Sequence, residues 1–278
     1  MSTQNALLTI LVEKINNDTL VLPTLPAVAL KVRKAADDPD INLNAMGDVI
    51  GQDPSLTARI IKISNSAYLG RAVKVTSINQ AVTRVGLHQI KNISTALAME
   101  QLFVSKNDLV GQYMNREWDK TIEVVANAMA AMQMYAKATK RRDLSLDTIT
   151  LSALVHNIGV LPILTEAERH EEVFANPEFL DDAIKKVSGR IGGNIMKVWG
   201  FDKSLINVAR YWHNLAYIPE KISYVDFVRI GAALAGRMDT QKEAVINLAI
   251  QRGVLKNEAD LESEDFKVAR DSGMQIFT

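Results

Sequence analysis

Apolar residues along most of the chain recur at spacings of three and four, which is the period of an amphipathic helix. The clearest run lies within 117–137, where the repeating apolar positions are Ile122, Val125, Ala126, Met129, Met132 and Ala136. The sequence contains no alternating strand pattern, no hairpin dipeptide between two apolar runs and no internal repeat. The pattern therefore predicts an all-α protein.

Residues that cap helices precede several of these runs. Asp53 stands directly before Pro54, which places an acid at the cap and a proline at the first helical position. Ser77 and Gln80 have the spacing of a capping box. Asn42, Asp202 and Ser263 are the other expected N-caps, and Gly200 is an expected left-handed C-cap. The expected helices span 28–36, 42–50, 54–65, 78–85, 88–102, 117–137, 147–159, 183–199, 203–212, 225–237, 242–252 and 263–272.

A polar stretch over 104–113, which contains Gly111, separates two clusters of expected helices. We interpret it as the connection between two helical subdomains. The sequence predicts an N-terminal helical bundle over residues 1–110, packed on a second bundle over residues 111–278 that includes the C-terminal helices.

Composition narrows the function classes. Lys and Arg number 32, as do Asp and Glu, so the formal net charge is zero and an avid nucleic-acid binder is not expected. The absence of cysteine excludes disulfides, thiolate metal sites and a cysteine nucleophile. No basic region precedes the apolar residues at the N-terminus, so no signal peptide is recognised and a cytoplasmic location is expected.

One segment is apolar enough to be compared with a membrane span. Residues 148–165 contain no Asp, Glu, Lys or Arg across 18 positions, which is near the length that a membrane requires. However, His156 and Asn157 lie in its middle, followed by Gly159 and Pro162. These residues favour a buried core helix, and no membrane association is expected.

Several motifs together resemble the HDOD family, a degenerate offshoot of the HD metal-dependent phosphohydrolases. They are Leu22-Pro23-Thr24-Leu25-Pro26, Asp53-Pro54, Asn65-Ser66-Ala67, the run from Ala81 to Gly86, Trp118, the run from Ala153 to Gly159, Gly192 and Trp199. The resemblance covers roughly residues 16–217. It implies an HD-like helical arrangement for the second bundle.

The resemblance also implies where a metal site would lie. HD hydrolases bring histidines and aspartates together on one or two divalent metals, which generate hydroxide beside a phosphate. In this chain the adjacent pair of the family is His156-Asn157, and an asparagine offers only one neutral carbonyl oxygen. The resemblance, aligned on Trp118 and the other motifs, places the remaining site positions at Lys120, Ser188, His213 and Ala232. Only His156 and His213 remain as candidate metal ligands, and two neutral imidazoles make a weak site.

Two functions follow from the resemblance. The first is a non-catalytic signal-transduction or interaction module with a degenerate metal site and no cofactor; a protein partner is expected, and the old cleft could take a nucleotide. The alternative is a metal-dependent phosphohydrolase or phosphodiesterase with an altered site. In that case His156 and His213 would hold a divalent metal with help from a carboxylate such as Asp226.

Overall fold

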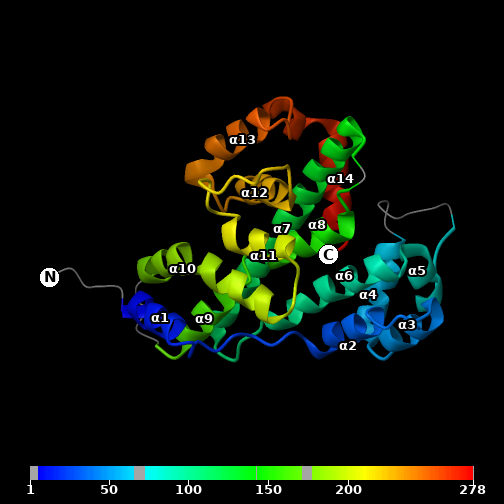
Figure 1. The fold of residues 1–278 in the computed structure, drawn as a ribbon, viewed down its shortest axis with the longest axis horizontal. Coiled ribbons are helices and arrows are strands. Elements are labelled where there is room, and N and C mark those ends of the chain that lie inside the picture. The colour runs from blue at the N-terminus through cyan, green and yellow to red at the C-terminus, as the bar shows by residue number, and fades with distance from the viewer. Residues whose placement is uncertain (1–5, 66–72, 142, 171–176, 278) are drawn as a thin grey trace.

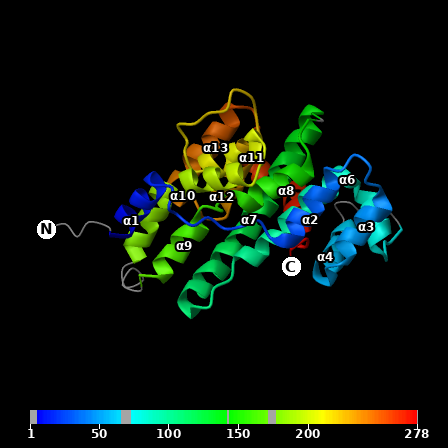
Figure 2. The same ribbon diagram turned by 60° about the horizontal axis from the view of Figure 1, so that its bottom comes forward.

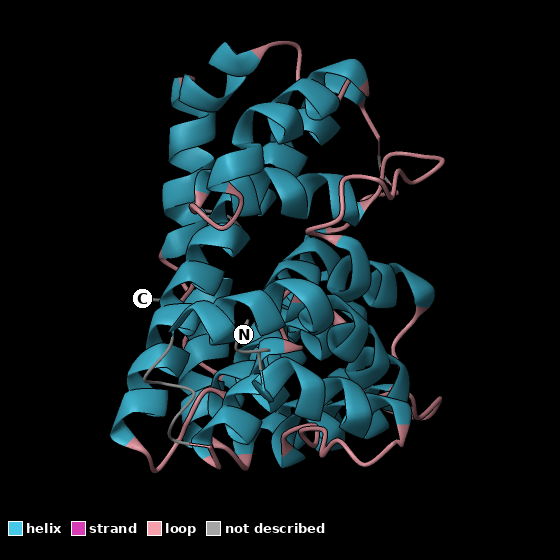
Figure 3. Ribbon diagram, turned by 90° about the vertical axis from the view of Figure 1, so that its left-hand side faces the viewer, coloured by secondary structure: helices cyan, strands magenta, loops and turns pink. Residues whose placement is uncertain are grey.

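The computed structural model describes residues 6–65, 73–141, 143–170 and 177–277. Every regular element in these residues is a helix, so the prediction of an all-α fold is confirmed (Figure 3). The first helices are α1 Ala6–Asn16, α2 Ala27–Ala36, α3 Leu43–Gly51, α4 Pro54–Ser64, α5 Ile78–Val85, α6 Leu87–Ala98 and the short 3-10 helix η1 Met99–Leu102. The later ones are α7 Asp108–Thr139, α8 Leu146–Val155, α9 Val160–Glu168, α10 Pro177–Val198, α11 Lys203–Tyr211, α12 Tyr224–Leu234, η3 Asp239–Gln241, α13 Lys242–Gln251, η4 Glu258–Glu262 and α14 Glu264–Met274.

The long helix α7 is the centre of the fold, and it packs against α8, α12 and α14 (Figure 1). Its middle carries small residues, including Ala126 and Ala128, which are fully buried. A side chain at Gly231 of α12 would collide with the backbone oxygen of Val124 and crowd Ala128. The helices therefore approach closely because small residues face each other at this crossing.

The N-terminal helix α1 lies at the opposite end of the molecule from α3 and α5 (Figure 1). It packs on α10 and α9, although these helices lie more than 140 positions later in the chain. A turn at residues 17–18 and an extended segment, residues 19–26, lead from α1 to α2 (Figure 2). The first helix is thus a neighbour of the later helices in space, while the boundary between residues 1–110 and 111–278 stays a prediction.

The proline-rich motif anchors this extended segment. The indole Nε1 of Trp199 donates a hydrogen bond of 3.0 Å to the carbonyl oxygen of Pro23. Arg33 of α2 donates to the carbonyl oxygen of Trp199 at 3.0 Å, and its guanidinium lies 4.0 Å from the ring centroid of Phe201. Two of the motifs that mark the family therefore meet at the end of α10, where they fix the path of the chain.

The expected N-caps are confirmed. Their side chains accept backbone hydrogen bonds at Asn42 (from Ala45, 2.9 Å), Asp53 (from Leu56, 2.9 Å), Ser77 (from Gln80, 3.3 Å), Asp202 (from Ser204, 2.8 Å) and Ser263 (from Phe266, 3.2 Å). The capping box at Ser77 differs in one detail, because the amide oxygen of Gln80 accepts from the backbone of Thr76. Gly200 has a φ of 70°, as expected for the residue after a helix.

Asn65 holds the chain that follows α4. Its side-chain amide donates to the carbonyl oxygen of Val75 and accepts from the backbone nitrogen of Val75, both at 2.8 Å. An asparagine at the end of the helix is explained by this pair of hydrogen bonds, because its amide both donates to and accepts from the backbone of one residue. Ser66 and Ala67 lie outside the described residues.

The polar stretch over 104–113 is shorter than expected. Helix α7 begins at Asp108, because Asn107 caps it by accepting from the backbone nitrogens of Leu109 and Val110 at 3.0 and 3.1 Å. Gly111 is accommodated inside the helix. The helix expected over 225–237 is also wrong at its end, since α12 stops at Leu234 and Arg237 lies in the turn that follows.

One helical segment, Leu146–Glu168, is long and apolar enough to cross a membrane, with a mean hydropathy of 1.5. In the folded protein, 89% of the most apolar 18-residue stretch of this segment is buried. The segment is also broken, because α8 ends at Val155 and α9 begins at Val160. Burial in the core accounts for its apolar character, as the sequence indicated.

Candidate functional site

His156 and Asn157 lie in the turn between α8 and α9, deep in the protein. His156 is 1% exposed, and its Nδ1 lies 2.5 Å from the carbonyl oxygen of Ala153. This contact makes Nδ1 the protonated nitrogen of a neutral ring, so Nε2 is left as an acceptor. Nε2 is buried and has no hydrogen-bond partner among the described residues.

Asn157 takes part in a network that the sequence does not reveal. Its Nδ2 donates a hydrogen bond of 2.9 Å to Oε2 of Glu117, on α7. The same carboxylate oxygen accepts a hydrogen bond of 2.7 Å from Nη1 of Arg237. Arg237 also donates to the backbone oxygen of Glu117 at 2.9 Å and to the hydroxyl of Thr121 at 3.2 Å. A guanidinium and a carboxylate thus form a linked, charge-assisted group beside the His156-Asn157 pair.

This ion pair is well covered. The side chain of Arg237 is 7% exposed and that of Glu117 is 15% exposed. Arg237 reaches the site because α12 ends in a tight turn, in which Gly236 has a φ of 72° and the backbone nitrogen of Arg237 donates to the carbonyl oxygen of Ala232 at 2.9 Å. The early end of α12 therefore directs a cation into the site.

Charge and burial act together on the histidines. Burial lowers the pKa of His156 well below its ordinary value, and the positive charge of Arg237 lowers it further. Burial likewise lowers the pKa of His213, with the charge of Arg229 as the second cause. Both rings are therefore neutral near pH 7.

Trp212 and His213 lie next to His156. The rings of His156 and Trp212 meet edge to face with centroids 4.9 Å apart, and His213 lies next along the chain. A side chain at Gly189 of α10 would collide with the ring of His213, so this glycine leaves the space that the ring fills. Arg229 fixes the turn by donating to the carbonyl oxygens of Tyr211 and Tyr217 at 3.0 and 2.7 Å.

The other positions inferred from the resemblance carry no metal-binding group into this network. Lys120 is half-buried on α7, one turn after Glu117, and makes no hydrogen bond or ion pair within the described ranges. Ser188 is buried where its carbonyl oxygen closely faces Gly159, and Ala232 is fully buried. Asp226, the carboxylate considered for a metal, accepts from Arg252 at 2.7 Å and from the backbone of Ser223 at 2.8 Å.

These residues do not fit a divalent metal. His156 has the arrangement of a ligand, with one ring nitrogen bonded to a carbonyl and the other available, and the buried Oδ1 of Asn157 likewise has no hydrogen-bond partner among the described residues. Asn157 contributes a neutral amide, the Glu117 carboxylate is already paired, and Arg237 brings a positive charge close to the histidine. In the part of the chain that the structure describes, no three His, Asp or Glu side chains gather closely enough to hold a metal ion.

Glu117 and Arg237 are the site residues that sequence reasoning missed. Glu117 directly precedes Trp118, one of the residues that carry the family resemblance, so its place beside the site could have been suspected. Arg237 gives no such signal, because its approach depends on where α12 ends. The fold and site together define an all-helical protein of HD-like architecture in which Glu117, Asn157 and Arg237 form a hydrogen-bonded network beside His156.

Comparison with known proteins gives the family. The model of the HDOD domain matches residues 22–215, which is well over half of the chain. The chain belongs to the HDOD family, as its motifs predicted.

Three relatives place the chain more closely. A crystal structure from Shewanella amazonensis SB2B, of a protein provisionally named a metal-dependent phosphohydrolase, is 40% identical, covers 100% of both chains and has a TM-score of 0.94. An HDOD domain protein of unknown function from Geobacter sulfurreducens is 18% identical over 99% of this chain and 98% of that one, with a TM-score of 0.64. An uncharacterized protein of Treponema pallidum (strain Nichols) is 28% identical over 211 residues, 72% of this chain, and the match spans only 39% of that longer protein.

Proposed function

We propose that this protein is a non-catalytic interaction module of the HDOD type that works in signal transduction. The observation that carries this proposal is the position of Arg237. Its guanidinium is bonded to Glu117, which in turn is bonded to Asn157, the residue that replaces the aspartate of the HD pair. On this proposal an internal cation, Arg237, lies in the neighbourhood where the family resemblance would put a metal.

The chemistry of hydrolysis needs what these residues do not supply. A metal lowers the pKa of its bound water and polarises a phosphate oxygen, and anionic ligands help to hold it by offsetting its charge. Here the carboxylate of Glu117 is neutralised by Arg237, and Asn157 cannot offset charge. The positive charge of Arg237 would also repel a divalent ion from Nε2 of His156.

On this proposal the protein acts by binding rather than by turnover. A protein partner is the expected binding partner, a nucleotide is the second class of ligand to test, and neither a cofactor nor a membrane is required. Its expected location is the cytoplasm. Family analogy supports the signalling role, and the site chemistry supports the absence of catalysis.

The first test is the metal content of the purified protein after exposure to manganese, iron, zinc and nickel, measured by inductively coupled plasma mass spectrometry. We expect metal at background level in the wild type. Near-stoichiometric metal that disappears in His156→Ala would overturn the proposal.

Two variants then ask what disarms the site. Asn157→Asp alone should not gain metal affinity, because Arg237 can pair with the new carboxylate as it does with Glu117. The double variant Asn157→Asp with Arg237→Met should bind metal more tightly than either single variant, since it adds an anion and removes the cation. Equal metal binding by the single and double Asn157 variants would show that Arg237 has no such effect.

A metal-dependent phosphohydrolase is the second candidate, favoured by the provisional name of the Shewanella amazonensis protein that is 40% identical. It predicts metal-stimulated hydrolysis of bis(p-nitrophenyl) phosphate by the wild type, lost in His156→Ala. The first candidate predicts the same trace rate in both proteins, with or without metal.

A further inference from the structure

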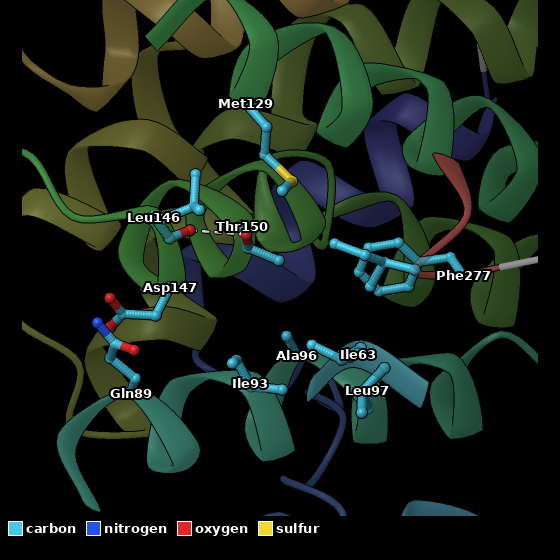
Figure 4. A pocket seen from close by; sticks show the side chains of 11 residues that line it. Ile63, Gln89, Ile93, Ala96, Leu97, Met129, Leu146, Asp147, Thr150 and Phe277 are labelled. Carbon is cyan, nitrogen blue, oxygen red and sulfur yellow. Dashed lines mark hydrogen bonds between the residues drawn. The ribbon is translucent and has the colours of Figure 1, made fainter. Parts of the chain in front are cut away.

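A cavity unrelated to the His156-Asn157 site lies between α4, α6, α7 and α8 (Figure 4). Its walls are mainly apolar, and its apolar lining includes Ile63, Ile93, Leu97, Met129, Ile276 and Phe277. It offers about 80 Å³ to the centres of water-sized molecules. That space is large enough for a few waters or for one small organic molecule.

One end of the cavity is polar. Asp147 lines it and is 4% exposed, and its Oδ2 accepts a hydrogen bond of 2.6 Å from Nδ2 of Asn92. Its Oδ1 is buried and has no partner among the described residues. Gln89 lies beside the Asp147 carboxylate at this end, and its side chain makes no hydrogen bond in the described part of the chain (Figure 4).

A buried carboxylate without a cation is costly, and only part of that cost is met here. Asp147 lies in the first turn of α8, where the helix dipole favours a negative charge. The described residues provide no ion pair for it, and Thr150, the other polar wall residue, spends its hydroxyl on the carbonyl oxygen of Leu146 at 2.6 Å. One oxygen of Asp147 is left with an unmet need for a donor.

We propose that this cavity binds a small primary amine with an apolar body, its ammonium group at Asp147. The ammonium would donate to Oδ1 and balance the carboxylate charge, while the body lies between Ile93 and Met129. Gln89 is half-buried and unbonded, so it can turn aside to expose the oxygen that it now helps to shield. A neutral apolar guest would leave Oδ1 unpaired.

The walls of this cavity come from distant parts of the chain, from Ile63 of α4 to Phe277 after α14. An occupant would therefore contact the early helices, the central helix and the C-terminal residues at once. The cavity would therefore be a small-molecule binding site in addition to the proposed interaction function. Its occupancy does not depend on whether the His156 site binds metal.

The test compares benzylamine with benzyl alcohol and toluene, which have similar bodies but no charge, by isothermal titration calorimetry on the full chain. We expect benzylamine to bind at least about tenfold more tightly than either neutral probe. Asp147→Asn should remove this preference. Asp108→Asn makes the same change in the first turn of α7, where the side chain is exposed, and should leave it intact.

A second variant covers the case in which Asp147→Asn does not fold. Ala96→Leu places a larger side chain in the cavity wall while Asp147 is kept, so it should abolish binding of all three probes. Failure of benzylamine to bind the wild type would overturn the proposal. So would equal affinity for benzylamine and benzyl alcohol, or unchanged benzylamine binding by Ala96→Leu.

Discussion

Removing the guanidinium of Arg237 is the most direct perturbation of the network beside the His156-Asn157 pair. In Arg237→Met a side chain of similar length remains, while Glu117 loses its hydrogen bonds of 2.7 and 2.9 Å from the guanidinium. Thr121 loses the bond of 3.2 Å. Because Glu117 is only 15% exposed, its carboxylate would be left poorly solvated and without a cation, with only the hydrogen bond from Asn157 remaining.

Breaking a buried ion pair by removing one partner costs about 3–5 kcal/mol, and we expect Arg237→Met to lower the free energy of unfolding by that amount. Arg237→Lys keeps the charge but not the two-pronged contact, so it should lie between Arg237→Met and the wild type. The double variant Arg237→Met with Glu117→Gln should lose less free energy of unfolding than the two single variants lose together, because it leaves no carboxylate without its cation.

Urea denaturation followed by far-ultraviolet circular dichroism measures these differences. Lys137→Met is the matched control, because Lys137 and Asp265 form an ion pair at 2.8 Å whose side chains are 78% and 70% exposed. Its effect on the free energy of unfolding should be negligible. A loss in Arg237→Met of less than about 1 kcal/mol, as for a surface pair, would refute the view that this buried ion pair stabilises the fold.

Two further predictions concern packing and pH. Gly159→Ala should cost about 1–3 kcal/mol of unfolding free energy, because a Cβ there would collide with the carbonyl oxygen of Ser188. In the control Gly51→Ala the new Cβ meets nothing within 4 Å, so this variant should be tolerated. Equal urea midpoints for the two variants would contradict this reasoning. His156 and His213 have lowered pKa values in the folded state, so below about pH 6.5 the unfolded chain takes up protons that the folded chain does not. Stability should therefore fall as the pH drops from about 7.5 to about 5.5, and His156→Gln should make that fall shallower; parallel pH profiles for the two proteins would count against the reasoning.

The sequence by itself determined the helical fold and most helix starts. Local signals were sufficient because an N-cap bond joins residues only two or three positions apart, as at Asp53 and Asp202. The apolar period likewise identified the buried face of α7. Family membership followed from motifs such as the proline-rich segment, whose physical role, a bond from Trp199 to Pro23, became visible only in three dimensions.

Helix ends and distant pairings were decided by tertiary structure. From the sequence, α7 was expected to start later and α12 to end later than they do. Whether a helix continues through a glycine, or stops at a turn, depends on the residues that pack around it. The position of α1 against α10 could not be read from its own residues.

The candidate site shows the same division. From its position in an apolar run we inferred that His156 is buried, and from the family resemblance we inferred that Asn157 replaces an aspartate. Only the folded chain brings Glu117 and Arg237, 120 positions apart, to within 2.7 Å of each other. It also brings Glu117 to within 2.9 Å of Asn157. A sequence states which charges exist, whereas the packing of α7 against α12 decides which of them meet, and here that packing places a cation beside the histidine.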